Sequence, residues 1–140
     1  MTRVVVDASV AIKWFVPEEL SPEARRLLDP GHELVAPDLL WAELGNALWK
    51  KSRRGELDQQ TARRLLRDFS RWPLAFHAAE RWVNVALELS IRHGVTVYDG
   101  LYLALAAGCR GRVVTADRRL RDASRVGALR DLVAWVGELD

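Results

Sequence analysis

The stretch RVVVDASVAIKWFVP, residues 3–17, contains a β-rich run, an aspartate and a helical segment in immediate succession. Val4–Val6 favour a strand because β-branched side chains suit a pleated surface. Asp7 follows the strand directly, and residues 8–15 are predicted to be helical up to the break at Pro17. A strand that passes through an acidic residue into a helix is typical of an α/β protein.

The rest of the chain repeats this alternation of strands and helices. It predicts further strands at 33–36, 74–77, 112–115 and 132–136, and helices at 21–29, 38–54, 58–71, 79–93, 100–108 and 117–126. Such alternation predicts parallel strands joined by right-handed crossovers, with helices on both faces of the sheet. The chain has 140 residues, 49% of them hydrophobic, and is expected to form a single domain spanning residues 1–140.

The composition argues against several classes of protein. A single cysteine leaves no disulfide framework within the chain. No apolar stretch is long enough to cross a bilayer and the first residues show no signal-peptide pattern, so we expect a cytoplasmic protein without a membrane partner. The sequence has no glycine-rich phosphate loop, its three histidines are scattered, and Ser9 lies outside any Gly-x-Ser-x-Gly elbow.

Acidic residues follow two of the predicted strands at the same end. Asp7 comes directly after Val4–Val6, and Asp117 comes just after the strand at 112–115. Because ligands bind beyond the carboxyl ends of parallel strands, both carboxylates are candidates for a functional site. A helix is predicted after each of them, so the alternative role of each is that of a helix N-cap.

Two further acids stand where a carboxylate without a partner is costly. Asp99 precedes residues 101–107, a segment that is apolar on all sides and is therefore expected to be buried; its alternative role is again a helix cap. Glu43 lies beside the apolar stripe that includes Leu40 and Leu44, whereas solvated glutamates usually lie opposite such a stripe. The alternative for Glu43 is a boundary residue paired with an arginine.

Together, these four acids predict a metal site for phosphoryl-transfer chemistry. Carboxylates gathered at one end of a sheet raise one another's pKa and need a counter-charge. Mg²⁺ takes oxygen ligands and retains water molecules, which suits carboxylates that face a phosphate. In this interpretation Asp7, Asp99 and Asp117 hold one or two ions, directly or through water, and Glu43 completes the site or orients a water molecule.

Hydroxyl and basic residues near these acids have candidate roles as well. Ser9 and Thr115 are expected to fix the geometry of the carboxylates, with plain roles in a helix and a strand as the alternative. All basic residues except three lysines are arginines, which suit bidentate phosphate recognition, although a GC-rich genome produces the same bias. Without the four acids, 21 basic residues face 15 acidic ones, a balance that favours a polyanionic partner.

Four segments contain these acids in the order and at the intervals of a known family: VVVDAS (4–9), APDLLWAE (36–43) with NAL (46–48), YDGLYLA (98–104) and VTAD (114–117). They resemble the PIN domain and, more narrowly, the VapC-type toxins of bacterial toxin–antitoxin pairs, over essentially the whole chain. The resemblance implies an α/β/α sandwich around a short, mostly parallel sheet, and endonucleolytic cleavage of RNA that depends on Mg²⁺ or Mn²⁺.

The resemblance also assigns residues and partners. Asp7, Glu43, Asp99 and Asp117 match the acidic quartet of the family, and Ser9 and Thr115 match the hydroxyl positions beside it. The implied partners are RNA, a small cognate antitoxin and a second copy of the chain in a homodimer. Gly100 departs from the many relatives that have alanine there, and it is expected to loosen the start of its helix.

The positions of several arginines and tryptophans in the sequence suggest which residues contact these partners. Arg118, Arg119 and Arg121 are the candidates for RNA contacts because they follow Asp117 closely; solvated helix faces are the alternative. Trp14, Trp41 and Trp49 lie on the early helices and are candidates for a groove that receives an antitoxin segment, with core packing as the alternative.

Two other functions stay open on the sequence alone. One is a catalytically inactive PIN-like module that binds RNA or protein, and the intact quartet counts against it. The other is a small phosphotransfer domain. Ser9 stands where an Asp-x-Asp phosphatase has its second aspartate, and Val6-Asp7 stands where a phosphoacceptor has paired acids, so both forms are disfavoured.

Overall fold

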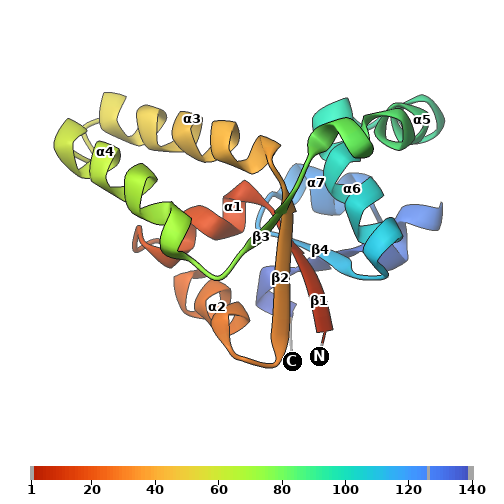
Figure 1. Cartoon of the computed structure of the whole chain (residues 1–140), viewed down its shortest axis with the longest axis horizontal. Helices are drawn as coiled ribbons and strands as arrows, with labels where there is room; N and C mark the ends of the chain where they lie inside the picture. Colours follow the sequence, from red (N-terminus) through yellow and green to blue (C-terminus); the bar gives the residue numbers. More distant parts are fainter. Residues whose placement is uncertain (1, 126, 139–140) are drawn as a thin grey trace.

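Five parallel strands form the central sheet of the molecule (Figure 1). The computed structural model describes residues 2–125 and 127–138. The strands are β1 (Thr2–Val6), β2 (His32–Pro37), β3 (Ala75–His77), β4 (Arg112–Thr115) and β5 (Val133–Trp135), and their order in the sheet is β3-β2-β1-β4-β5. All five predicted strands are confirmed, and the predicted α/β class with them.

The strand β1 lies at the centre of the sheet because its side chains are apolar on both faces. Val4 and Val6 belong to one hydrophobic core and Val5 to the other, as the alternation of a strand requires. Pairing of Val6 with Val114 sets the register of β1 against β4. The carboxyl ends of these two neighbouring strands therefore lie side by side.

Helices cover both faces of the sheet and make the predicted sandwich (Figure 1). The α-helices are α1 (Ala8–Ala11), α2 (Ser21–Arg25), α3 (Leu39–Arg53), α4 (Gln59–Asp68), α5 (Val83–His93), α6 (Val97–Cys109) and α7 (Arg118–Ala123). Residues of α1, α2 and α3 share the core that contains Val4, whereas residues of α6 and α7 share the core that contains Val5. In the described part of the chain no helix has the length and apolar character needed to span a membrane.

The helix α6 begins earlier than the sequence predicts. Thr96 is its N-cap, and the Thr96 hydroxyl accepts a hydrogen bond of 3.1 Å from the backbone N–H of Asp99. Asp99 therefore lies inside the first turn, and the alternative role of Asp99 as a helix cap is wrong. Threonine is a favoured N-cap residue, so Thr96 was the signal for the helix start. The sequence prediction did not include Val97 and Tyr98 in the helix.

Gly100 allows α5 and α6 to pack closely. A Cβ atom at this position would lie 2.8 Å from the backbone oxygen of Ala86 on α5, a distance at which something must shift. Gly100 therefore has a packing role, and its expected effect on the start of the helix stays a prediction. The absence of a side chain lets the backbone of α5 approach the first turn of α6, which contains Asp99.

The three tryptophans of the early helices divide between core and surface. Trp14 is 3% exposed and stacks on Trp72 at 5.4 Å between ring centroids, and Trp41 packs edge-on against Phe69 at 5.1 Å. Trp49 is 54% exposed and lines a cavity of about 480 Å³ between α3 and α4. Core packing accounts for the first two, and only Trp49 faces a groove.

Candidate active site

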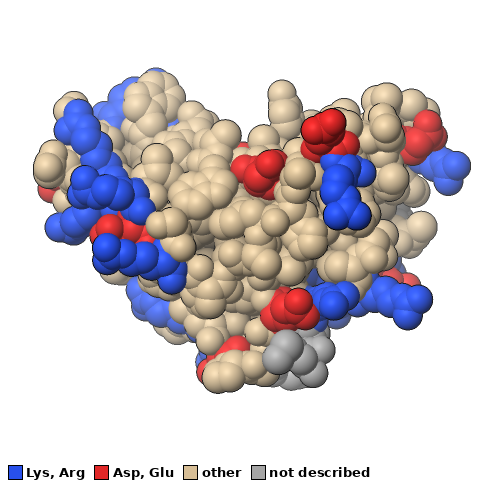
Figure 2. All heavy atoms as spheres, viewed as in Figure 1, with Lys and Arg blue, Asp and Glu red and all other residues tan. Residues whose placement is uncertain are grey.

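The fold brings the four predicted acids to one end of the sheet. Asp7 follows β1, Asp117 follows β4, Glu43 lies on α3 and Asp99 lies on α6. The charges of Asp99 and Asp117 act on Asp7, and those of Asp7 and Asp99 act on Glu43. Figure 2 shows that the surface is hollowed at this end of the sheet, between the arm formed by α3 and α4 and the side of the molecule formed by α5 and α6.

Asp7 is held by hydrogen bonds to both oxygens of its carboxylate. Oδ1 accepts from the backbone N–H of Ser9 at 3.1 Å, which caps α1, and Oδ2 accepts from the hydroxyl of Thr115 at 2.6 Å. Burial raises the pKa of the Asp7 carboxyl; these hydrogen bonds oppose the rise, and the charges of Asp117 and Asp99 add to it. The N-cap role and a place in the acidic site therefore coexist in this residue.

The hydroxyls of Thr115 and Ser9 connect the ends of β1 and β4. Thr115 is fully buried, and its Oγ1 donates to Asp7 and accepts from the backbone N–H of Asp117 at 3.0 Å. Ser9 Oγ accepts from the backbone N–H of Ala116 at 2.9 Å. Thr115 thus contacts a carboxylate directly, whereas the hydroxyl of Ser9 fixes the backbone just before Asp117.

Glu43 has a partner that the sequence reasoning missed. The hydroxyl of Tyr102, a residue that is only 2% exposed, donates to Glu43 Oε1 at 2.5 Å. Burial raises the pKa of the Glu43 carboxyl, this hydrogen bond opposes the rise, and the charges of Asp7 and Asp99 add to it. Burial and the neighbouring Glu43 raise the pKa of Tyr102 far above its usual value, so the phenol remains a donor. The available signal was the single hydroxyl in the apolar segment 101–107.

Arg119 bridges the other two acids. Its guanidinium contacts Asp99 Oδ2 at 2.9 Å and Asp117 Oδ2 at 3.2 Å, and its backbone N–H donates to Asp117 Oδ1 at 2.9 Å. Asp117 is therefore also the N-cap of α7. The hydrogen bond and the charge of Asp99 raise the pKa of Arg119. Arg119, predicted as an RNA contact, here pairs with two carboxylates of the quartet.

Arg118 and Arg121, the other two arginines predicted to contact RNA, lie in different surroundings. Both line a cavity of about 790 Å³ that also includes Asp117 and Trp135. The guanidinium of Arg121 lies over the ring of Trp135, 4.7 Å from its centroid. These two arginines therefore border the acidic site without pairing with its carboxylates.

The donor chemistry of the site suits a hard divalent cation, although its present arrangement does not. Four carboxylates that repel one another offer oxygen ligands. The guanidinium of Arg119 already supplies positive charge between Asp99 and Asp117. Within residues 2–125 and 127–138, no three acidic, histidine or cysteine side chains are arranged so that they could hold one ion. The residues fit a metal by the chemistry of their oxygen donors, and Arg119 contacts two of them.

Asp7 and Glu43 are predicted to oppose folding of the metal-free protein less as the pH falls below neutral. Because burial raises the pKa values of Asp7 and Glu43, the folded state binds more protons than the unfolded state between the unfolded and folded pKa values. The free energy of unfolding therefore rises as the pH falls through the folded pKa values, and at neutral pH the two charges oppose folding.

Glu43→Gln keeps the acceptor for Tyr102 and removes one of these charges. We expect it to stabilise the metal-free protein by about 1 kcal/mol, which is roughly 2–5 °C in melting temperature for a chain of this size, and to flatten the pH dependence. The measurement is a melting series in EDTA at several pH values, with Glu88→Gln on the exposed side of α5 as the control. A Glu43→Gln protein that melts below the wild type at neutral pH would contradict this prediction.

Comparisons with known proteins identify relatives over nearly the whole chain. The PIN domain family matches residues 4–126. Ribonuclease VapC3 of Pyrobaculum aerophilum is 38% identical over 122 residues, which are 86% of this chain and 93% of that protein. Ribonuclease VapC1 of Mycobacterium tuberculosis is 32% identical over 125 residues, which are 86% of this chain and 90% of that protein.

Solved structures share the fold. The crystal structure of PAE2754 from Pyrobaculum aerophilum has a TM-score of 0.66 and 24% identity, and covers 97% of this chain and 85% of that one. VapBC2 from Rickettsia felis, bound to a DNA fragment from its promoter, has a TM-score of 0.59 and 10% identity. The match covers 96% of this chain and 98% of that one. A toxin–antitoxin complex from Klebsiella pneumoniae has a TM-score of 0.57 and 15% identity. The match covers 83% of this chain and 88% of that one.

Proposed function

Because this chain belongs to the PIN domain family, we propose that it is a metal-dependent endoribonuclease and the toxin of a toxin–antitoxin pair. Relatives named ribonuclease VapC support the activity, and fold neighbours from toxin–antitoxin complexes support an antitoxin partner. The observation that carries the proposal is the gathering of the family's four acids around the ends of β1 and β4. Family membership leaves the phosphotransfer alternative without support.

In this proposal Asp7, Asp99 and Asp117 hold Mg²⁺ or Mn²⁺, and Glu43 completes the site or orients a water molecule. When bound, the ion supplies positive charge to the phosphate and makes water more acidic. Thr115 fixes the orientation of the Asp7 carboxylate through its 2.6 Å hydrogen bond. Tyr102, which stays protonated, holds Glu43 against the site, and the raised pKa of Glu43 suits it to accept a proton from water.

The two ion pairs of Arg119 predict competition with the metal. Arg119→Gln frees Asp99 and Asp117, and exposed pairs of this kind contribute about 0.2–1 kcal/mol each. We therefore expect the variant to bind Mn²⁺ about two- to thirtyfold more tightly and to melt lower in EDTA. Titration calorimetry measures the affinity, and Arg118→Gln is the matched control on the same helix. Equal Mn²⁺ affinity of all three proteins would show that Arg119 does not compete.

The groove beside Trp49 is our candidate for the antitoxin segment. Trp49 lines it together with Leu48 and Leu66, and the guanidinium of Arg53 lies 4.8 Å from the centroid of the Trp49 ring. An amphipathic helix that lays its apolar face into a groove is a common mode of peptide recognition, and exposed tryptophans are frequent anchors.

Trp49→Ala is accordingly expected to weaken binding of the cognate antitoxin at least about tenfold, since anchor residues typically contribute more than 1 kcal/mol. Its melting temperature and RNA cleavage should stay at wild-type values, because the side chain is exposed and lies outside the acidic site. Affinity is measured with the two purified proteins. An unaltered dissociation constant would place the antitoxin elsewhere on the surface.

The predicted homodimer remains part of the proposal. Val83, Leu87 and Ile91 are exposed at four-residue intervals on one face of α5, and Ile91 is 69% exposed. A row of exposed apolar side chains on one helix is typical of a protein–protein interface. A second copy of the chain, packed on α5, is the occupant we propose for this face.

A further inference from the structure

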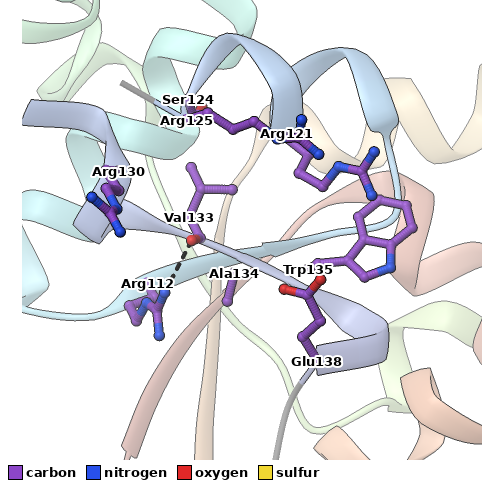
Figure 3. Close-up of a pocket in the computed structure, with 9 residues that line it drawn as sticks. All are labelled: Arg112, Arg121, Ser124, Arg125, Arg130, Val133, Ala134, Trp135 and Glu138. Atoms are coloured by element: carbon purple, nitrogen blue, oxygen red, sulfur yellow. Dashed lines mark hydrogen bonds between the residues drawn. The ribbon is translucent and has the colours of Figure 1, made fainter. Parts of the chain in front are cut away.

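A cavity lined by arginines lies along the edge strand β5, outside the acidic quartet (Figure 3). Its volume is about 250 Å³, and Arg112, Arg121, Arg125 and Arg130 contribute to its walls. We propose that this cavity is a second RNA site, which holds backbone phosphates and guides the strand toward Asp117. The proposal rests on the proposed ribonuclease function and adds to it the path that the substrate takes.

The four guanidinium groups come from separate parts of the chain. Arg112 begins β4, Arg121 lies on α7, Arg125 follows α7, and Arg130 lies in the 3-10 helical segment Gly127–Leu132 before β5. Figure 3 shows Arg112 and Arg130 toward one end of β5 and Arg121 at the other, above the ring of Trp135. Such an arrangement surrounds a space from several sides, as a bound phosphate requires.

Two of these arginines have fixed positions. Arg112 donates from Nη2 to the backbone oxygen of Val133 at 3.0 Å, and the guanidinium of Arg121 lies 4.7 Å from the centroid of the Trp135 ring. A guanidinium that is already positioned loses little side-chain entropy when it binds a phosphate. The backbone oxygen of Val133 already accepts from Arg112, so it is less available to an extended peptide that would add as a strand to β5.

The charge around the cavity is positive. Asp122 pairs with both Arg121 and Arg125, at 3.2 Å and 3.4 Å, and Glu138 also lines the cavity. Arg112 and Arg130 have no carboxylate partner among the residues that the structure describes. The excess of guanidinium over carboxylate favours a polyanion.

The cavity lies next to the cavity that borders the acidic site, and the two share walls. Arg121 and Trp135 line both this cavity and the larger one of about 790 Å³, whose walls include Lys13, Arg118 and Asp117. A strand whose phosphates occupy the arginine cavity would pass the stacked side chains of Arg121 and Trp135 and would reach Asp117. An acidic peptide explains the charge but not this path to the quartet.

The test measures binding of a labelled single-stranded RNA by fluorescence anisotropy at several salt concentrations. All proteins are made in an Asp7→Asn background, so that the RNA stays intact. Arg130→Gln removes a side chain that has no hydrogen bond in the described structure, so it leaves the fold undisturbed. We expect its dissociation constant to rise about fivefold and its salt slope to fall by about 0.7, the value for one lost phosphate contact on a single strand.

The control is Arg92→Gln, an exposed arginine at the end of α5 that should leave both quantities unchanged. Arg130→Gln in the active protein should cut a four-nucleotide RNA at the wild-type rate and a long RNA more slowly. Equal affinities and slopes of Arg130→Gln and Arg92→Gln would overturn the proposal. Poly-glutamate serves as the probe for an acidic peptide. The proposal would also be overturned if Arg130→Gln bound poly-glutamate more weakly than its parent protein but bound RNA equally well. Because binding is measured apart from cleavage, failure of the ribonuclease function would be seen separately, as absent cutting by every variant.

Discussion

Asp7→Asn is expected to cut RNA at least about 100-fold more slowly than the wild type, since loss of a metal ligand typically has an effect of this size or larger. The substitution removes one negative charge at the centre of the quartet while the amide oxygen can still accept from the backbone of Ser9. Cleavage of a structured RNA is measured with Mg²⁺ or Mn²⁺, and EDTA should stop it. Asp99→Asn should show a loss of the same size.

Asp58→Asn is the matched control for the cleavage assay. Asp58 caps α4 as Asp7 caps α1, accepting from the backbone N–H of Thr61 at 2.7 Å, and asparagine is an equally good cap. It lies outside the quartet, so its cleavage rate should equal that of the wild type. Undiminished cutting by both Asp7→Asn and Asp99→Asn would remove the quartet from the mechanism. Absence of cutting by the wild type would favour an inactive binding module.

Induction of the wild-type chain in a bacterial host should arrest growth, and induction of Asp99→Asn should be harmless. The physical reason is the same loss of cleavage by at least about 100-fold, which leaves too little activity to deplete cellular RNA. Asp99 suits this comparison because Thr96, not Asp99, caps α6, so the variant retains its helix cap. Growth curves and colony counts after induction give the result.

The growth experiment has two controls. Equal amounts of both proteins, measured by immunoblot, exclude a difference in expression. Co-expression of the cognate antitoxin that the proposed function requires should restore growth, which tests this partner. Equal toxicity of wild type and Asp99→Asn would indicate a cause other than catalysis.

The sequence by itself determined the elements of the fold and the positions of the acids along it. Runs such as Val4–Val6 and the apolar stripe of Leu40 and Leu44 are local patterns, and such patterns depend only on side-chain periodicity. Parallel strands then bring their carboxyl ends to one edge, so Asp7 and Asp117 could be placed at the same edge of the sheet without a structure. That β1 and β4 are neighbours was shown by the structure alone. The start of α6 was misplaced because a threonine cap was outweighed by the apolar segment that follows it.

Only the tertiary structure decided which groups contact the acids. Tyr102 reaches Glu43, Thr115 reaches Asp7, and Arg119 turns toward Asp99 although it is a neighbour of Asp117 in sequence. The arginine cavity likewise joins residues from β4, α7 and the segment before β5. Contacts between residues so far apart in the chain depend on the register of the strands and the packing of helices on them. Neither has a local signature, because many sequences with the same periodicity would orient these side chains differently.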